Sequence, residues 1–137
     1  MGDVIEKITL LNQNDLSNVG HGYIKETEVR QMTVEAMVDT GARNLVMGEE
    51  TCKRLGLGIV EEREATLAGG VRYPCKVTEA VTIRWKDRYT ICSALVLPGK
   101  DEILLGVMPL EDMDLNVNPG KGCLEGAHGD YWVRYVR

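Results

Sequence analysis

The chain has 137 residues, a net charge of −5 at neutral pH and 44% hydrophobic residues. This length suits one folded domain, which we expect to span residues 1–137. The acidic balance and the lack of a basic block argue against a nucleic-acid-binding protein. No apolar run is long enough to cross a membrane and the first residues have no signal-peptide pattern, so we expect no membrane partner and a cytoplasmic location.

The first quarter of the chain indicates strands on either side of a polar segment. Residues 4–11 are rich in β-branched and apolar residues, which is typical of a strand. Residues 12–22 are rich in Asn, Asp, Ser and Gly, which favours a loop. Residues 23–38 alternate partially, so we expect one or two strands there, the last ending at Val38.

Asp39 follows the apolar segment 36–38 and precedes Thr40 and Gly41. A carboxylate placed directly after a buried strand is costly to bury unless it is hydrogen-bonded or shares a proton. Thr40 supplies a neighbouring hydroxyl, and Gly41 permits a tight turn. The segment therefore indicates an acid presented from the end of a strand, although a strand ending in an ordinary polar turn would have the same residues.

The middle of the chain alternates between strands and turns. Residues 44–47 form a short apolar segment typical of a strand. Residues 49–55 predict a helix, because acids stand in its first turn, bases in its last turn and Gly56 follows. Residues 57–67 again favour a strand.

Two further turns are indicated after this strand. Residues 68–73 place Gly69 and Gly70 between extended segments, which predicts a hairpin turn and also suits a mobile lid. Residues 76–85 and 88–97 predict the next hairpin, with its turn at Lys86 and Asp87.

Cysteine and histidine residues form no pattern typical of a metal site. No Cys-x-x-Cys pair is present, and both histidines have glycine neighbours. We therefore expect reduced, mostly packed thiols, no metal and no cofactor. The cysteines are Cys52, Cys75, Cys92 and Cys123, and the histidines, both expected in loops, are His21 and His128.

The segment Val38-Asp39-Thr40-Gly41-Ala42, together with Leu104-Leu105-Gly106, resembles the retropepsin-like aspartic proteases, which are single-lobed relatives of pepsin. Members of this family carry the catalytic acid in an Asp-Thr-Gly loop. A β-hairpin flap follows, and a later hydrophobic-hydrophobic-Gly strand passes beside the loop and starts a short helix. The same order of features occurs over residues 4–118, so the resemblance covers most of the chain.

The resemblance implies an all-β fold, an acid-protease closed half-barrel with a flap hairpin and one or two short helices, one of them at residues 107–111. It implies that Asp39 is catalytic, that Thr40 and Gly41 support the catalytic loop, and that Leu104, Leu105 and Gly106 are structural beside the site. The substrate-binding residues that it implies are Ala42, Gly69, Gly70 and Val71.

Two positions depart from the pattern of the viral enzymes. Arg43 and Asn44 stand where those enzymes commonly have further acids that grip the substrate backbone. Val107 stands where they often have an arginine. These changes remove a familiar ion pair and alter the expected interface and substrate contacts.

The chemistry of this family requires two carboxylates around one water, which share a proton because they cannot both ionise. Asp39 is the only aspartate followed by Thr-Gly or Ser-Gly. A complete site therefore needs a second copy, which a twofold homodimer supplies. The resemblance implies a homodimeric endopeptidase that cleaves an extended peptide or protein segment.

Two other functions remain open. The chain could be a non-catalytic peptide-binding or scaffolding module with the same fold, or a metal-dependent hydrolase, for which the histidines are too few.

Residues 115–117 and 123–125 predict a last hairpin. Residues 131–136 predict a terminal strand that pairs either with the chain's own sheet or with a second copy.

Overall fold

The computed structural model describes residues 3–67, 69–99 and 101–133, and in these residues the chain is mostly β-structure with three short α-helices. The elements in chain order are β1 (Val4–Asn12), α1 (Gln13–Gly20), the 3₁₀-helix η1 (Glu26–Glu28), β2 (Gln31–Val38), β3 (Leu45–Met47), α2 (Glu49–Arg54), β4 (Ile59–Thr66), β5 (Arg72–Thr78), β6 (Val81–Trp85), β7 (Arg88–Cys92), β8 (Ala94–Val96), β9 (Leu104–Leu105), α3 (Val107–Asp112), β10 (Leu115–Asn118) and β11 (Cys123–Gly126). No helix in the described ranges is both long enough and apolar enough to span a membrane.

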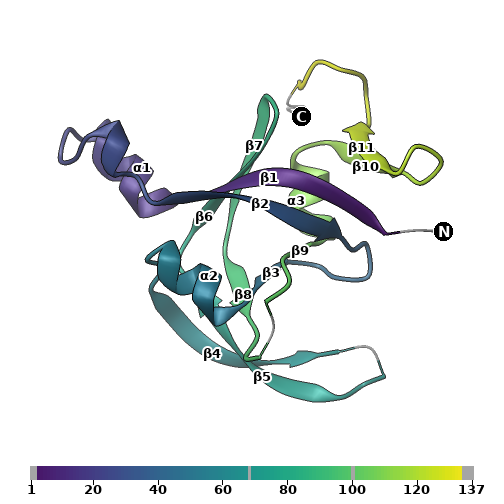
Figure 1. Cartoon of the computed structure of the whole chain (residues 1–137), viewed down its shortest axis with the longest axis horizontal. Helices are drawn as coiled ribbons and strands as arrows, with labels where there is room; N and C mark the ends of the chain where they lie inside the picture. The colour runs from purple at the N-terminus through teal and green to yellow at the C-terminus, as the bar shows by residue number, and fades with distance from the viewer. Residues whose placement is uncertain (1–2, 68, 100, 134–137) are drawn as a thin grey trace, which may run out of the picture.

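Among the described residues, nine strands form one sheet in the order β4-β5-β8-β3-β9-β2-β1-β6-β7, and β10 pairs with β11 in a separate two-stranded sheet. Figure 1 shows the β4–β5 hairpin and the β10–β11 pair on opposite sides of the molecule. The all-β class is therefore confirmed. The edge strands β4 and β7 do not pair with each other in the described part of the chain, so the sheet is open where a closed one was expected.

The shortest strand, β9, decides the geometry at the centre of the sheet. It pairs in parallel with β2, where Val38 lies opposite Leu105, and antiparallel with β3, where Leu45 also lies opposite Leu105. Because β9 lies between β2 and β3, the connection between those two strands must pass across the end of β9. Residues 39–44 are therefore held next to Gly106.

Alternating strand residues supply a single main core. Strand β1 shows the pattern, since Ile8 and Leu10 are buried while Lys7 and Thr9 are more exposed. Each such apolar side chain contributes roughly 1.5–3 kcal/mol through burial. Fully buried apolar members of this core include Ile8, Leu10, Ala36, Leu45, Met47, Leu55, Val81, Ile83, Leu105 and Met113.

The loop expected at residues 12–22 is wrong, because this segment contains helix α1. The Asn12 side chain caps the helix by accepting a hydrogen bond from the Asp15 backbone N–H at 3.0 Å. The buried Asp15 carboxylate accepts hydrogen bonds of 2.9 Å from the Arg30 backbone N–H, Nε and Nη2. A cap and a distant arginine thus stabilise a helix in a segment whose composition favours a loop.

The strands expected at residues 23–38 and 76–85 are shorter or divided. A 3₁₀ turn occupies Glu26–Glu28, and β2 begins only at Gln31. The second segment is broken between β5 and β6, where the Glu79 carboxylate accepts the Gly58 N–H at 2.7 Å. Residues 88–97 are likewise divided between β7 and β8.

The last part of the chain agrees with expectation only up to β11. The predicted hairpin at residues 115–125 is present as β10 and β11. The strand predicted at residues 131–136 is wrong for residues 131–133, which form no strand. There the Trp132 ring packs edge-on against Tyr89, with ring centroids 5.4 Å apart. Residues 134–136 lie outside the described residues.

Candidate active site

Asp39 lies directly after β2 and is partly exposed. Its backbone N–H donates to the Leu105 carbonyl at 3.0 Å, which extends the β2–β9 pairing by one residue. Its carboxylate Oδ1 accepts the Gly41 N–H at 2.9 Å, and its carbonyl accepts the Ala42 N–H at 3.1 Å. These bonds fold residues 39–42 into a tight turn that holds the carboxylate in a defined direction.

The first turn of α3 holds the second half of this loop. The backbone N–H groups at a helix start have no partner within the helix. Here the Gly106, Val107 and Met108 N–H groups donate to the carbonyls of Asn44, Ala42 and Arg43, at 3.1, 2.9 and 2.9 Å. The loop carbonyls therefore accept hydrogen bonds from N–H groups that have no partner within the helix, and the same bonds hold the loop in place.

Gly106 permits this close approach. A Cβ at this position would lie 2.5 Å from the Asn44 carbonyl oxygen and 2.7 Å from the Ala42 carbonyl oxygen. Both obstacles are backbone atoms, so they cannot move aside without displacing the loop. The predicted structural role of Gly106 beside the site thus has a steric basis.

The Asp39 carboxylate adjoins a cleft of about 670 Å³, which lies between the Asp39 loop and the β4–β5 hairpin. Its polar side chains are those of Asp39, Arg43, Asn44 and Thr66. Most of its wall is apolar, formed by Ala42, Val46, Ala65, Leu67, Leu95, Leu97 and Leu104. Such a mostly apolar cleft with a few polar groups is typical of a ligand-binding site.

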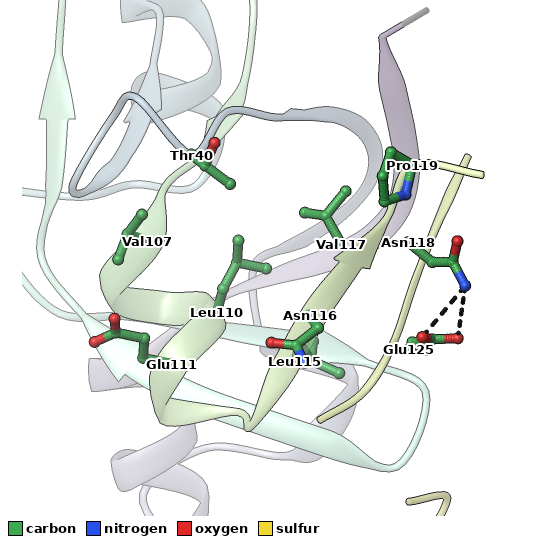
Figure 2. A pocket seen from close by; sticks show the side chains of 10 residues that line it. All are labelled: Thr40, Val107, Leu110, Glu111, Leu115, Asn116, Val117, Asn118, Pro119 and Glu125. Carbon is green, nitrogen blue, oxygen red and sulfur yellow. Dashed lines mark hydrogen bonds between the residues drawn. The ribbon is translucent and has the colours of Figure 1, made fainter. Parts of the chain in front are cut away.

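Thr40 lies on the other side of the loop, at a second hollow of about 470 Å³ (Figure 2). Figure 2 shows Thr40 at one end of this hollow, with α3 below it and β10 opposite. Thr40 is exposed, and its hydroxyl has no hydrogen-bond partner among the described residues. The far wall includes Asn118, whose amide donates to the Glu125 carboxylate at 3.2–3.3 Å.

The residues predicted for the site divide into two groups. Asp39, Gly41, Ala42 and Leu104 line the cleft, whereas Leu105 is fully buried beneath it. Gly69, Gly70 and Val71 lie at the exposed end of the β4–β5 hairpin and are not among the described residues that line the cleft. A substrate contact by these three residues stays a prediction.

The cleft also contains residues that the sequence did not single out. Val46 of β3 and Leu95 of β8 line it, as does Leu97, which directly follows β8. The sequence indicated only that these residues lie in strands. Their place in the cleft depends on the parallel β3–β8 pairing, which is not evident from local sequence. The hairpin residues in the wall are Ala65, Thr66 and Leu67, which precede the predicted glycine tip.

The cysteines act as packing residues. All four are free thiols, and Cys52 and Cys75 are buried. Burial raises the pKa of the Cys52 and Cys75 thiols, and raises the pKa of Cys92 to about 11. Because the thiolate is the reactive form, these groups are poor nucleophiles at neutral pH. Among the described residues no group of three His, Cys, Asp or Glu side chains could hold a metal ion.

A sequence profile described as aspartyl protease matches residues 25–108, which is more than half of the chain. The chain belongs to the aspartyl protease family. The match includes the Asp39 loop, the β4–β5 hairpin and the Leu104-Leu105-Gly106 segment, so the predicted family membership is confirmed. No curated protein sequence matches the chain significantly.

A solved structure supports the retropepsin-like form of this aspartyl protease fold. The retroviral protease-like domain of Ddi1 from Leishmania major superposes with a TM-score of 0.56 and 16% sequence identity. The superposition covers 91% of this chain and 88% of that one. At this identity the likeness establishes the fold, and together with the family match it supports a protease-like hydrolase.

Proposed function

We propose that this aspartyl protease family member is an endopeptidase that acts as a homodimer, with Asp39 of each subunit at the shared site. The observation that carries the proposal is the partly exposed Asp39 carboxylate in the wall of a cleft of about 670 Å³. The cleft is mostly apolar and opens beneath a β-hairpin, which suits an extended peptide.

The chemistry follows from placing two Asp39 carboxylates around one water. The two acids share one proton, because like charges this close cannot both ionise. The ionised carboxylate removes a proton from the water as it attacks the scissile carbonyl, and the protonated one donates a hydrogen bond to the carbonyl oxygen. The apparent pKa values then belong to the pair rather than to either residue.

Two features of a single chain favour the dimer. Thr40 follows the acid, is exposed, and its hydroxyl has no partner among the described residues. In the dimer this hydroxyl would bond to backbone across the twofold axis. The hollow that adjoins Thr40 between α3 and β10–β11 would then face the second subunit.

Substrate capture would rely on the β4–β5 hairpin. An extended peptide can add main-chain hydrogen bonds to strands, and alternate side chains then enter pockets. The apolar residues Leu67, Leu95 and Leu97 offer such pockets beside the Asp39 loop. A cytoplasmic location stays a prediction from the sequence.

The proposal is tested by incubating the protein with a diverse peptide mixture from acid to neutral pH and reading cleavage by mass spectrometry. Asp39→Asn, which keeps the size of the side chain, is the control. We expect cuts with the wild type that are absent with Asp39→Asn. A folded wild-type dimer that binds peptides without cutting them would instead favour a non-catalytic peptide-binding module.

A further inference from the structure

Arg43 is a charged residue of the cleft that the proposed chemistry does not use. It is exposed and lines the same cavity as Asp39. Asp39 and Arg43 are the only charged side chains among the described residues of that wall. A cation at the edge of a mostly apolar cleft attracts a ligand of opposite charge, and a ligand that fills the cleft excludes part of the water that would screen this attraction.

The guanidinium of Arg43 has no acid partner in the described part of the chain. Ion pairs there involve Arg30, Arg63, Arg72 and His128. The Arg43 Nη2 donates to the Met108 sulfur at 3.8 Å, which is a weak interaction. The nearest acid along the chain, Asp39, instead accepts the Gly41 N–H. Most of the five donors of the guanidinium are therefore available to a ligand.

The backbone that carries Arg43 is fixed. The Arg43 carbonyl accepts the Met108 N–H at 2.9 Å, and the neighbouring Ala42 carbonyl accepts the Val107 N–H at 2.9 Å. A guanidinium on a fixed backbone can bind a carboxylate with two parallel hydrogen bonds, which adds specificity to charge attraction.

We infer that Arg43 determines substrate specificity by binding an acidic side chain, Glu or Asp, of the peptide in the cleft. This inference rests on the proposed function. Arg43 lies four residues after Asp39, and because even an extended chain rises only about 3.3 Å per residue, their Cα atoms are at most about 13 Å apart, a distance that four residues of an extended peptide cover. The acidic residue should therefore lie within about four positions of the scissile bond.

The experiment compares peptide pairs that are cleaved at the same bond and differ only by Glu or Gln, at each position up to four residues from that bond. All peptides have amidated C-termini, and a free-acid set tests whether a terminal carboxylate binds instead. Variants are Arg43→Gln and Arg43→Glu. The matched control is Arg54→Gln, because Arg54 is exposed in the last turn of α2 and does not line the cleft.

For the wild type we expect kcat/KM to be about tenfold higher or more for Glu than for Gln at one position, since a charge-assisted hydrogen bond is lost with Gln. Arg43→Gln should bring this ratio close to one, Arg43→Glu should invert it, and Arg54→Gln should keep it. An equal rate for Glu and Gln in the wild type, or a ratio that survives in Arg43→Gln, would overturn the inference. A preference confined to the free-acid peptides would overturn it as well.

The dimer dissociation constant of each variant, measured by analytical ultracentrifugation, separates substrate recognition from a role at the subunit interface. If Arg43→Gln weakens the dimer and slows the Glu and Gln peptides equally, Arg43 pairs with the second subunit and the inference is wrong.

If no peptide is cleaved, the proposed function fails, and binding of the same pairs to the Asp39→Asn dimer tests Arg43 alone. If the Glu peptide binds more tightly than the Gln peptide only when Arg43 is present, the inference is supported. If the two peptides bind equally, the inference is contradicted.

Discussion

The Gly106 backbone N–H donates a hydrogen bond of 3.1 Å to the Asn44 carbonyl, and a Cβ on Gly106 would lie 2.5 Å from that same oxygen. The two ends of the site, the loop after β2 and the start of α3, therefore meet at a distance that only glycine permits. This contact, together with the hydrogen bonds that the Val107 and Met108 N–H groups donate to the Ala42 and Arg43 carbonyls, holds the loop that carries Asp39.

Gly106→Ala should destabilise the fold and displace the Asp39 loop. We expect a loss of about 1–3 kcal/mol in the free energy of unfolding, typical of overpacking, measured by urea denaturation. Gly20→Ala is the matched control, because a Cβ at Gly20, the last residue of α1, meets no atom within 4 Å. Equal stabilities for the two variants would contradict the steric role of Gly106.

The Asp15–Arg30 pair should make stability depend on acid pH. Hydrogen bonds from the Arg30 guanidinium lower the pKa of Asp15 from its usual value of 3.8. A carboxylate with a lower pKa in the folded state contributes stability that is complete above the unfolded pKa, about 4, and is lost as pH falls through the folded pKa.

Asp15→Asn should therefore lower the free energy of unfolding by about 1–3 kcal/mol at pH 7, an amount limited by the exposure of Arg30. This loss should become smaller as the pH falls below about 4. Denaturation curves from pH 7 to pH 2.5 check this. Asp101→Asn, at an exposed position, is the control. A difference between wild type and Asp15→Asn that stays constant with pH would show that the pair's ionisation is not responsible.

Arg88 should hold the β10–β11 pair in place. Its side chain is buried. The guanidinium donates from Nη1 to the Met113 and Asp114 carbonyls at 2.9 and 2.7 Å, and from Nη2 to the Gly129 carbonyl at 2.8 Å. A lysine cannot satisfy three carbonyls with the same fixed fork.

In Arg88→Lys we expect amide hydrogens of β10 and β11 to exchange at least about tenfold faster, corresponding to a local loss of about 1.4 kcal/mol or more. Hydrogen-exchange mass spectrometry measures this, with the amides of the β1–β2 pairing as an internal reference. Uniform acceleration over both regions would mean that Arg88 stabilises the whole fold rather than this pair.

The flap role of the β4–β5 hairpin depends on its glycine turn. Gly69 and Gly70 have φ values of +90° and +79°, which favour glycine, and the Gly70 N–H donates to the Leu67 carbonyl at 3.0 Å. Gly70→Ala should strain this turn by about 1 kcal/mol, lower Tm by only about 3–4 °C and lower kcat/KM several-fold. Unchanged kcat/KM in Gly70→Ala would contradict a role of this turn in the flap.

Local sequence was sufficient for the parts of the site made by short-range contacts. The Asp39 turn closes through Gly41 and Ala42, within three residues, and α2 has its acids and bases in the expected turns. The Leu104-Leu105-Gly106 segment was located by its resemblance to a family, since a two-residue strand has no periodicity of its own.

The parts that sequence could not provide depend on partners far along the chain. Helix α1 is stabilised by Asp15 and Arg30, which are fifteen residues apart. The apolar wall of the cleft depends on the parallel β3–β8 pairing, which joins Val46 to Leu95. Neither interaction leaves a signal in a short window of residues.

Mixing wild-type and Asp39→Asn subunits at constant total concentration and measuring peptide cleavage shows whether two copies of Asp39 form one site. If each site needs Asp39 from both subunits, mixed dimers are inactive and activity follows the square of the wild-type fraction, so an equal mixture retains about one quarter of the full rate. An equal mixture that retains about one half, with activity proportional to the wild-type fraction, would show that each chain works alone and would contradict the proposal.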